Sequence, residues 1–189
     1  EAYALLSSDT PSLGIILDYP KEEKEVQDIL KDKVSVTVDN IPGETTGVFN
    51  VLGAGNYASR ILIPAIKSEG GKLRMLVSSG GVSAVHSAKK YGFAKASTNS
   101  DEAIKDIGAD TLVIATRHSD HCKHVLCGLE SGKHIFCEKP LCLTLDELSK
   151  IESSSVQHPN QKLMVGFNRR FAPMIVKMKA LLDNLSAPK

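Results

Sequence analysis

The chain has 189 residues, of which 42% are hydrophobic and 24% charged, and its formal net charge is +1. This length suits one ordinary domain with a real core plus some further chain, and it is short for two full domains. The balanced charge predicts no general attraction to nucleic acid or to a membrane surface. No apolar run reaches the roughly 20 residues of a membrane-spanning helix, and the start shows no signal-peptide pattern. Because the chain opens at Glu1 instead of Met, a targeting segment upstream stays open.

Residues 1–46 follow a different pattern from the rest of the chain. They predict an amino-terminal αβαβ extension, with the end of a helix at 1–6, a strand at 13–19, an amphipathic helix at 22–30 and a strand at 34–38. Residues 39–47 contain Asn40, Pro42 and Gly43 and predict a linker.

From Val48 onward, short apolar runs alternate with segments of helical periodicity, which is typical of βαβ units in a parallel sheet. The apolar runs predict strands at 48–52, 73–78, 111–115, 134–137 and 163–166. The predicted fold class is therefore α/β, a Rossmann-like doubly wound parallel sheet with helices on both faces.

The segments between these strands predict helices with recognisable ends. One helix should follow Gly55, another should span 82–91, and a last helix is predicted at 171–185. The expected landmarks are a kink at Pro64, a C-terminal cap at Gly92, N-caps at Ser100 and Ser119, and a capping box between Thr144 and Glu147.

A glycine-rich motif, G-x-G-x-x-A over Gly53 to Ala58, follows the first of these strands and opens a helix. Gly53 permits a tight turn, Gly55 lets the backbone approach a pyrophosphate, and Ala58 keeps the helix close to the strand. The free N–H groups at the helix start, around Asn56 and Tyr57, then face the anion. The motif predicts a dinucleotide site, and a glycine-rich packing turn is the alternative.

The second strand lacks the acidic residue that usually follows it in this kind of site. Ser78 and Ser79 stand where that acid would hold the adenosine ribose. A carboxylate would repel a 2′-phosphate, whereas small hydroxyls and backbone N–H groups tolerate it. The cofactor is therefore predicted to be NAD or NADP, with Ser78 and Ser79 as contacts; a simple turn is the alternative.

The third strand runs into Thr116 and Arg117, in the loop expected beside the first βα turn. Both residues are therefore predicted to contact the cofactor. His121, in the first turn of the next helix, either faces the site or caps its own helix.

The strand at 134–137 ends in Glu138, Lys139 and Pro140. Pro140 stops the strand and restricts Lys139 to extended geometry, which aims both charges at the edge of the sheet where ligands bind. A lysine beside a cationic nicotinamide would release its proton more readily, which suits proton transfer. Lys139 is therefore the candidate catalytic residue, and an exposed ion pair is the alternative.

Four cysteines lie close together, at positions 122, 127, 137 and 142. They lack the framework of a small disulfide-rich secreted protein, which favours free thiols and a cytoplasmic location. His118, His121 and His124 nearby raise the alternative of a zinc site. No C-x-x-C pair is present, however, so buried thiols are the favoured interpretation and no metal is predicted.

Several motifs follow one another in a characteristic order and spacing. They are Gly53 to Ala58, Ala115-Thr116, His121, Gly132 to His134, Glu138 to Pro140 and Val165 to Phe171. Together they resemble the Gfo/Idh/MocA oxidoreductase family over residues 47–175. The resemblance implies a Rossmann domain followed by an α/β domain that receives the substrate. The expected domains are then 1–46, 47–170 and, at 171–189, the start of that second domain.

The same resemblance implies roles for individual residues. The lysine of Glu-Lys-Pro contacts substrate near the nicotinamide, and the preceding acid lies by the nicotinamide ribose, which here are Lys139 and Glu138. Asn168 and Arg170 match the segment that lines the cofactor cleft, whereas Arg117 stands where many relatives have proline. The second domain, with its further catalytic groups, is expected to lie beyond Lys189, so the chain alone is expected to be inactive.

A second likeness concerns the amino-terminal residues. Glu1 to Leu6 and Gly14 to Pro20 are similar to the closing helix and strand of zinc-type medium-chain alcohol dehydrogenases. This likeness implies an internal slice of a fused two-module oxidoreductase.

These observations predict the cofactor-binding domain of an NAD(P)-dependent oxidoreductase that acts on a sugar, cyclitol or related secondary alcohol. The expected partner is a small molecule, and a homo-oligomer is compatible with the sequence. The alternatives are a nicotinamide-dependent lyase or glycoside hydrolase that oxidises its substrate transiently, and a non-catalytic nucleotide-binding module. A methyltransferase with a similar glycine loop would leave Glu138 to Pro140 unexplained.

Overall fold

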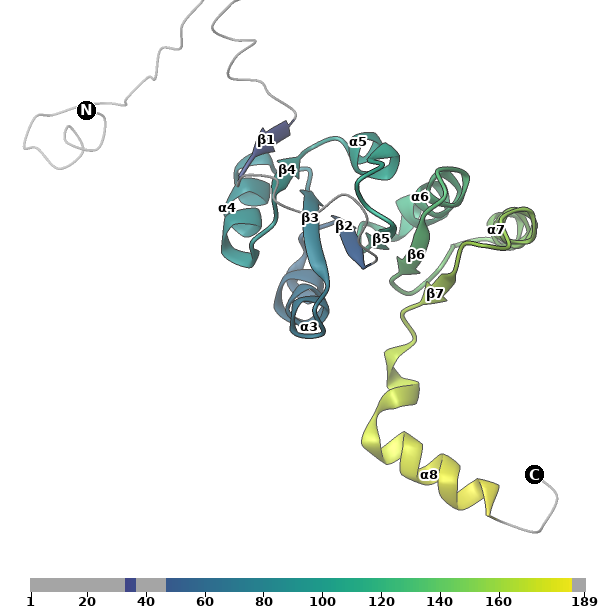
Figure 1. Ribbon diagram of the computed structural model, residues 1–189. Coiled ribbons are helices and arrows are strands. Elements are labelled where there is room, and N and C mark those ends of the chain that lie inside the picture. The colour runs from purple at the N-terminus through teal and green to yellow at the C-terminus, as the bar shows by residue number, and fades with distance from the viewer. Residues whose placement is uncertain (1–32, 37–46, 185–189) are drawn as a thin grey trace, which may run out of the picture. The chain divides into compact units, whose positions relative to one another are not determined.

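The computed structural model describes residues 33–36 and 47–184, so the elements predicted within residues 1–32 and the linker at 39–46 lie outside the described residues. The described strands form a sheet of order β1-β4-β3-β2-β5-β6-β7 (Figure 1). The strands are β1 (Lys33–Ser35), β2 (Val48–Leu52), β3 (Lys72–Val77), β4 (Lys95–Ser97), β5 (Thr111–Ile114), β6 (His134–Cys137) and β7 (Leu163–Val165).

The sheet confirms the predicted α/β class, with two additions at one edge. The five strands predicted from Val48 onward are present, and their ends agree with the prediction to within one residue. The short strand β4 was not predicted, and it pairs in parallel with β3. The strand predicted at 34–38 is represented by β1, which pairs antiparallel with β4. The sheet is therefore mixed, with one antiparallel edge strand on an otherwise parallel sheet.

Helices cover both faces of the sheet, as Figure 1 shows. One face packs against α3 and α4, and the other packs against α5, α6 and α7. The helical segments are η1 (Ala58–Leu62), α3 (Ile63–Ser68), α4 (Gly81–Tyr91), α5 (Ser100–Lys105), α6 (His118–Glu130), α7 (Leu145–Gln157), η2 (Asn168–Phe171) and α8 (Pro173–Asp183).

The two hydrophobic cores follow from the alternation of side chains along each strand. Val51 and Val113 face the core that also holds Ile63, Ala88 and Phe93. Their neighbours in the chain, including Leu52 and Leu112, face the core that holds Ile104, Leu129 and Ile151. Because successive side chains of a strand point to opposite faces, a central strand that is apolar throughout must be covered on both sides.

A row of hydrogen bonds aligns the residues that directly follow the strands. The N–H of Gly53 donates to Val77 O, that of Ala115 to Leu52 O, that of Glu138 to Ile114 O and that of Gly166 to Cys137 O, at 2.8–2.9 Å. These residues therefore lie along one edge of the sheet. From β2 the chain proceeds to β3 and β4 on one side, and β5 returns to the other side of β2. The loops after β2 and β5 thus meet at the topological switch point, where open α/β sheets bind ligands.

Two predicted N-caps are wrong. The α5 helix is capped by Asn99, whose side chain accepts from Asp101 N at 3.0 Å, and Ser100 is the first helical residue. Asn and Ser cap about equally well, and the amide one residue earlier satisfies the first free N–H groups. The α6 helix starts at His118 with Arg117 as its N-cap, so Ser119 lies inside its first turn. The capping box of Thr144 with Glu147 is confirmed in full.

Prolines shape two helices in ways that the sequence indicated only in part. Before Pro64, residues 58–62 form a π-helical segment in which Ile63 N donates to Ala58 O, and the α-helix α3 continues from it. Proline lacks the N–H that an ordinary α-helical bond would need there, and such sites commonly bend a helix. The helix predicted at 171–185 is interrupted, because Ala172 precedes Pro173 and is extended, with ψ of 134°. Residue 185 lies outside the described residues.

A buried polar cluster closes the amino end of the sheet. Asn50 is fully buried, donates to Ala103 O at 2.8 Å and accepts from Met75 N at 2.9 Å. Lys133 is 5% exposed and donates from Nζ to Asp106 O and Ala109 O, both at 2.6 Å. Burial would raise the pKa of Asp106, but hydrogen bonds led by that of Arg74, at 2.7 Å, hold its pKa below the usual value. Each of these buried polar side chains thus has hydrogen-bond partners, as buried polar groups require.

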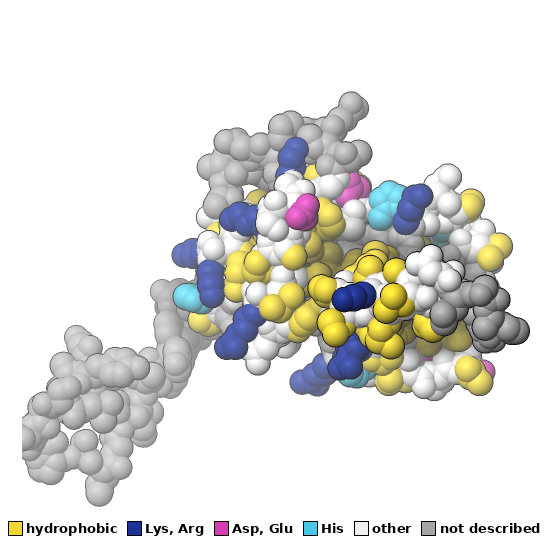
Figure 2. Space-filling model, turned by 90° about the horizontal axis from the view of Figure 1, so that it is seen from below, with side chains coloured by type: hydrophobic (Ala, Val, Ile, Leu, Met, Phe, Trp, Pro, Cys, Tyr) yellow, Lys and Arg dark blue, Asp and Glu magenta, His cyan; other side chains and the backbone are white. Residues whose placement is uncertain are grey.

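Helix α8 buries none of its side chains. Figure 2, seen from below, shows hydrophobic surface interspersed with basic side chains on this side of the molecule. The exposed apolar residues of α8 are Met174, Ile175, Val176, Met178, Leu181 and Leu182. None of the helices within residues 47–184 is both long and apolar enough to span a membrane.

Candidate functional site

A pocket of about 370 Å³ lies where the loops after β2, β5, β6 and β7 meet. Two larger hollows, of about 560 and 530 Å³, lie against α6 and α7 and beside α3, and neither brings together residues from several strand ends. The pocket at the strand ends is therefore the candidate site. It is lined by Gly55, Asn56, Tyr57, Ala58, Ala115, Thr116, His118, His121, Glu138, Lys139 and Asn168.

Glycine is needed at the two motif positions for different structural reasons. Gly53 has φ of +100°, and a methyl group there would collide with the carbonyl oxygen of Ala115. Gly53 thus allows the turn after β2 to pass closely beside the turn after β5. A methyl group at Gly55 would meet nothing within 4 Å, so its open side faces the space in front of the helix start. That space is where an anion can approach the backbone.

His121 joins the loop after β5 to the loop after β6. Its ring is 1% exposed, and Nδ1 lies 2.7 Å from Pro140 O while Nε2 lies 3.3 Å from Thr116 O. Both ring nitrogens thus face carbonyl oxygens, which can only accept, and the shorter distance indicates that Nδ1 carries a proton directed at Pro140 O. His121 therefore lines the pocket and also holds Pro140 beside the turn at Thr116. It does not cap its own helix through a side-chain bond.

Glu138 and Lys139 follow β6 directly, as the sequence predicted, and both line the pocket. The peptide bond between Lys139 and Pro140 is cis. Oε2 of Glu138 accepts from Lys139 N at 3.3 Å, whereas Oε1 is buried and has no hydrogen-bond partner among the described residues. Lys139 is exposed. The pocket thus presents an unpaired carboxylate oxygen next to an accessible lysine side chain.

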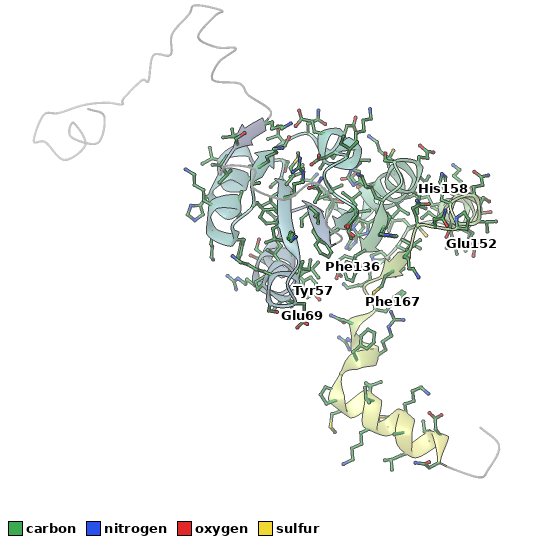
Figure 3. The ribbon with its side chains drawn as sticks, in the orientation of Figure 1. Tyr57, Glu69, Phe136, Glu152, His158 and Phe167 are labelled. Atoms are coloured by element: carbon green, nitrogen blue, oxygen red, sulfur yellow. The ribbon has the colours of Figure 1, made fainter. Side chains whose placement is uncertain are left out.

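The motif helix and the segment after β7 meet across the pocket. Nδ2 of Asn168 donates to the hydroxyl of Tyr57 at 3.1 Å, which joins residues 111 positions apart. Figure 3 shows Tyr57 and Phe167 at the lower end of the strands, where β7 continues toward α8. Because the Tyr57 hydroxyl accepts this bond, its own proton stays available for a ligand.

Some predicted contacts lie outside this pocket. Ser78 directly follows β3, where its N–H donates to Ser97 O, and Ser79 is exposed beside it. The exposed side chain of Arg117 stands at the start of α6, and the guanidinium of Arg170 lies 4.9 Å from the Phe171 ring centre. Their predicted roles stay predictions. His118, by contrast, lines the pocket although the sequence indicated it only as a metal ligand, and its position after Thr116 was the available signal.

The cysteine side chains near the site are buried or half-buried, whereas His118 is exposed. All four cysteines are free thiols. Burial raises the pKa of Cys122, Cys137 and Cys142, that of Cys137 to about 12, so these thiols stay protonated. Burial likewise lowers the pKa of His124 below 6.5. Residues 33–36 and 47–184 contain no group of three or more His, Cys, Asp or Glu side chains placed to hold a metal ion.

The pocket fits a dinucleotide. Gly55 leaves open space at a helix start, which suits a pyrophosphate. The carboxylate of Glu138, which lines the pocket, can accept from a ribose hydroxyl. The profile of the Gfo/Idh/MocA family, an oxidoreductase family with an NAD-binding Rossmann fold, matches residues 48–167. The chain belongs to this family.

Individual members of the Gfo/Idh/MocA family extend the comparison. Over 96 residues the chain is 38% identical to the NAD-dependent scyllo-inositol 2-dehydrogenase of Bacillus subtilis and covers 28% of its length. Over 96 residues it is 31% identical to the myo-inositol 2-dehydrogenase of Thermotoga maritima, again covering 28%. These stretches are 51% of this chain in each case.

A solved structure agrees with these relatives. The apo scyllo-inositol dehydrogenase of Lactobacillus casei matches with a TM-score of 0.69 at 25% identity. The match covers 73% of this chain and 41% of that one. The chain therefore spans less than half the length of the proteins it matches.

Proposed function

We propose that residues 47–170 bind NAD or NADP and form the cofactor domain of an oxidoreductase that acts on a cyclitol, a sugar or a related secondary alcohol. One observation carries the proposal: the pocket at the switch point combines the open side of Gly55, the unpaired Oε1 of Glu138 and the exposed Lys139. Family membership and the two inositol dehydrogenases among the relatives support the class of substrate.

Different residues bind different parts of the cofactor. The backbone at Gly55 and Asn56 turns its N–H groups toward the pyrophosphate, and Gly53, whose own N–H is bonded to Val77 O, forms the tight turn before them. The carboxylate of Glu138 accepts from a hydroxyl of the nicotinamide ribose. Tyr57 and Asn168, joined by their hydrogen bond, close the pocket on the side of β7.

The remaining predicted contacts belong to the two ends of the cofactor. Ser78 and Ser79 lie at the adenosine end, where the missing acid admits a 2′-phosphate. Thr116 and His121 shape the wall between the loops after β5 and β6. Arg117 and Arg170, both exposed, are further basic candidates for contact with the anionic cofactor.

Lys139 handles the substrate proton. A bound nicotinamide supplies the site that takes or returns the hydride of a substrate C–H group. The Nζ atom of Lys139 hydrogen-bonds the substrate hydroxyl and takes up or returns its proton. The neighbouring carboxylate of Glu138 keeps the local charge balanced without using Lys139 Nζ as a partner, since Oε2 is bonded to the Lys139 backbone N–H.

Calorimetric titration of the 189-residue chain with NADH and NADPH tests the cofactor assignment. We expect saturable binding of at least one of them. If neither binds to the folded chain, the cofactor site proposed for these residues is wrong.

The role of Lys139 is tested by pH–rate profiles of Lys139→Ala and Lys139→Arg in the full-length enzyme. Loss of turnover in the first, and an altered pH profile in the second, is expected. Unchanged kinetics in both variants would contradict the assignment. Net accumulation of NADH or NADPH during turnover distinguishes a dehydrogenase from a lyase or glycoside hydrolase that regenerates its cofactor.

The cellular location, the class of partner and the origin of residues 1–46 are also proposals. The free thiols favour a reducing cytoplasm, and the near-neutral charge favours a small-molecule partner over nucleic acid. From the likeness of residues 1–6 and 14–20, residues 1–46 derive from a zinc-type medium-chain dehydrogenase module. Sequencing the coding region upstream would refute this origin if no such module precedes them.

A further inference from the structure

The carboxylate of Glu138 lies directly against the backbone of Gly166. The two residues follow the neighbouring strands β6 and β7, and Gly166 N donates to Cys137 O at 2.8 Å. A methyl group built on Gly166 would lie 2.7 Å from Oε1, 3.0 Å from Cδ and 3.3 Å from Oε2 of Glu138. A side chain at position 166 and the present position of this carboxylate therefore exclude each other.

The backbone itself does not require glycine at this position. Among the described residues, the glycines with positive φ are Gly47, Gly53, Gly70, Gly92 and Gly132, and Gly166 is not one of them. No atom of another residue is among the three nearest to the missing methyl group, since all three belong to Glu138. The carboxylate of Glu138 is thus the group nearest to the space that glycine leaves open here.

Only one of the two oxygens of this carboxylate has a hydrogen-bond partner among the described residues. Oε2 accepts from the Lys139 N–H at 3.3 Å, while the buried Oε1 has no partner among the described residues. A buried acceptor without a donor is unfavourable, so a ligand that lets the carboxylate turn toward a donor would relieve this cost. The pocket that Glu138 lines opens toward Gly55, Thr116 and Asn168.

We propose that Gly166 is a positioning residue for Glu138, because its missing side chain lets the carboxylate lie deep enough in the pocket wall to accept from the ribose of the bound cofactor. The inference rests on the proposed function of this pocket. Alanine at position 166 would push the carboxylate away or turn it to another rotamer, because its methyl group would lie 2.7 Å from Oε1. Because the displaced group is the end of a flexible side chain, the fold tolerates the change and the hydrogen bond to the cofactor is lost.

The test is a set of dissociation constants for NADH, measured by titration of the 189-residue chain. The chain contains no tryptophan, so the fluorescence of the bound nicotinamide can be followed without a protein donor. The set comprises the unmodified chain, Gly166→Ala, Glu138→Ala and the double variant. We expect Gly166→Ala to weaken binding roughly 10-fold, the loss of one hydrogen bond to a charged group. In the Glu138→Ala background the same change should have no further effect.

A variant with a shorter acidic side chain provides a second test. Glu138→Asp withdraws the carboxylate by one methylene group, so adding Gly166→Ala to it should change the dissociation constant less than 2-fold. A purely structural role of Gly166 would give the same loss in all three backgrounds. If Gly166→Ala does not fold but its double variant with Glu138→Ala does, the contact with Glu138 is supported; if both fail to fold, the inference is overturned.

Different results would contradict the proposed cofactor site and the proposed role of Gly166. Unchanged NADH affinity in Glu138→Ala, or no binding by the unmodified chain, removes the proposed function of the pocket and the inference with it. Weaker binding in Glu138→Ala together with unchanged affinity in Gly166→Ala overturns the inference and leaves the proposed function intact.

Discussion

Replacing each of the two motif glycines by alanine should have opposite consequences. At Gly53 the new methyl group collides with the Ala115 carbonyl, and φ is +100°. At Gly55 the methyl group meets nothing within 4 Å, and φ lies outside the left-handed region. Gly53→Ala should therefore damage the fold, whereas Gly55→Ala should leave the fold intact and obstruct the cofactor.

The magnitudes follow from these two environments. An L side chain in a sparsely populated region costs about 1–3 kcal/mol, and an overpacked contact costs about as much again. Gly53→Ala should thus lower the free energy of unfolding by about 2–6 kcal/mol, a large part of a typical domain stability of about 5–15 kcal/mol. Gly55→Ala should raise it by about 0.4–1 kcal/mol, because alanine restricts the unfolded chain.

Two measurements on each variant separate these effects. Urea unfolding reports the stability, and titration with NADH reports the cofactor site. Gly55→Ala should weaken NADH binding about 10-fold or more, equivalent to about 1.4 kcal/mol. Wild-type affinity in Gly55→Ala would refute the placement of the pyrophosphate, and wild-type stability in Gly53→Ala would refute the argument from its contact with Ala115.

Three further predictions concern the fold around the site. Asn50→Ala leaves the Met75 N–H and the Ala103 carbonyl without their partners, so urea unfolding should show a loss of about 2–5 kcal/mol, and a loss below about 1 kcal/mol would contradict this reading. Thr144→Ala removes a capping box and should cost about 0.5–2 kcal/mol, with faster hydrogen exchange in the first turn of α7 and unchanged NADH affinity; unaltered exchange there would count against the cap. Burial lowers the pKa of His124 in the folded state, so the unfolded chain takes up the proton first and the free energy of unfolding falls as the pH drops below 6.5. His124→Gln should make this fall shallower between about pH 7.5 and 5.5, and an identical slope in both proteins would exclude His124 as its source.

The sequence predicted those parts of the fold that depend on residues close together in the chain. Strand β6 is an apolar run closed by two charges and a proline, and both of its ends match the prediction. Glu138 and Lys139 were found for the same reason, because a residue that directly follows a buried strand must lie at the edge of the sheet. The Thr144 cap needs only a spacing of three residues, which the sequence shows directly.

Other features depend on contacts between distant residues and left no local pattern. The role of Asn50 needs Met75 and Ala103, which lie 25 and 53 positions away. Strand β4 is three residues long, too short for a recognisable alternation, and it is stabilised by β1 and β3 on either side. The contact between Gly166 and Glu138 is likewise invisible in the sequence, since a glycine outside a turn gives no hint of what occupies the space beside it.

The buried ammonium group of Lys133 makes the amino end of the sheet chemically observable. Its side chain is 5% exposed and bonded to two carbonyl oxygens, so an amine-reactive reagent can modify it only after this end has opened. Strand β6 separates Lys133 from Glu138, and the two residues therefore report on opposite ends of the same strand. If opening at Lys133 requires the whole sheet to unfold, a cofactor bound at the far end will slow its labelling in proportion to ligand saturation. If that end opens by itself, the labelling rate of Lys133 will not depend on the cofactor. The labelling rate of this one lysine thus reports whether the two ends of the sheet unfold together.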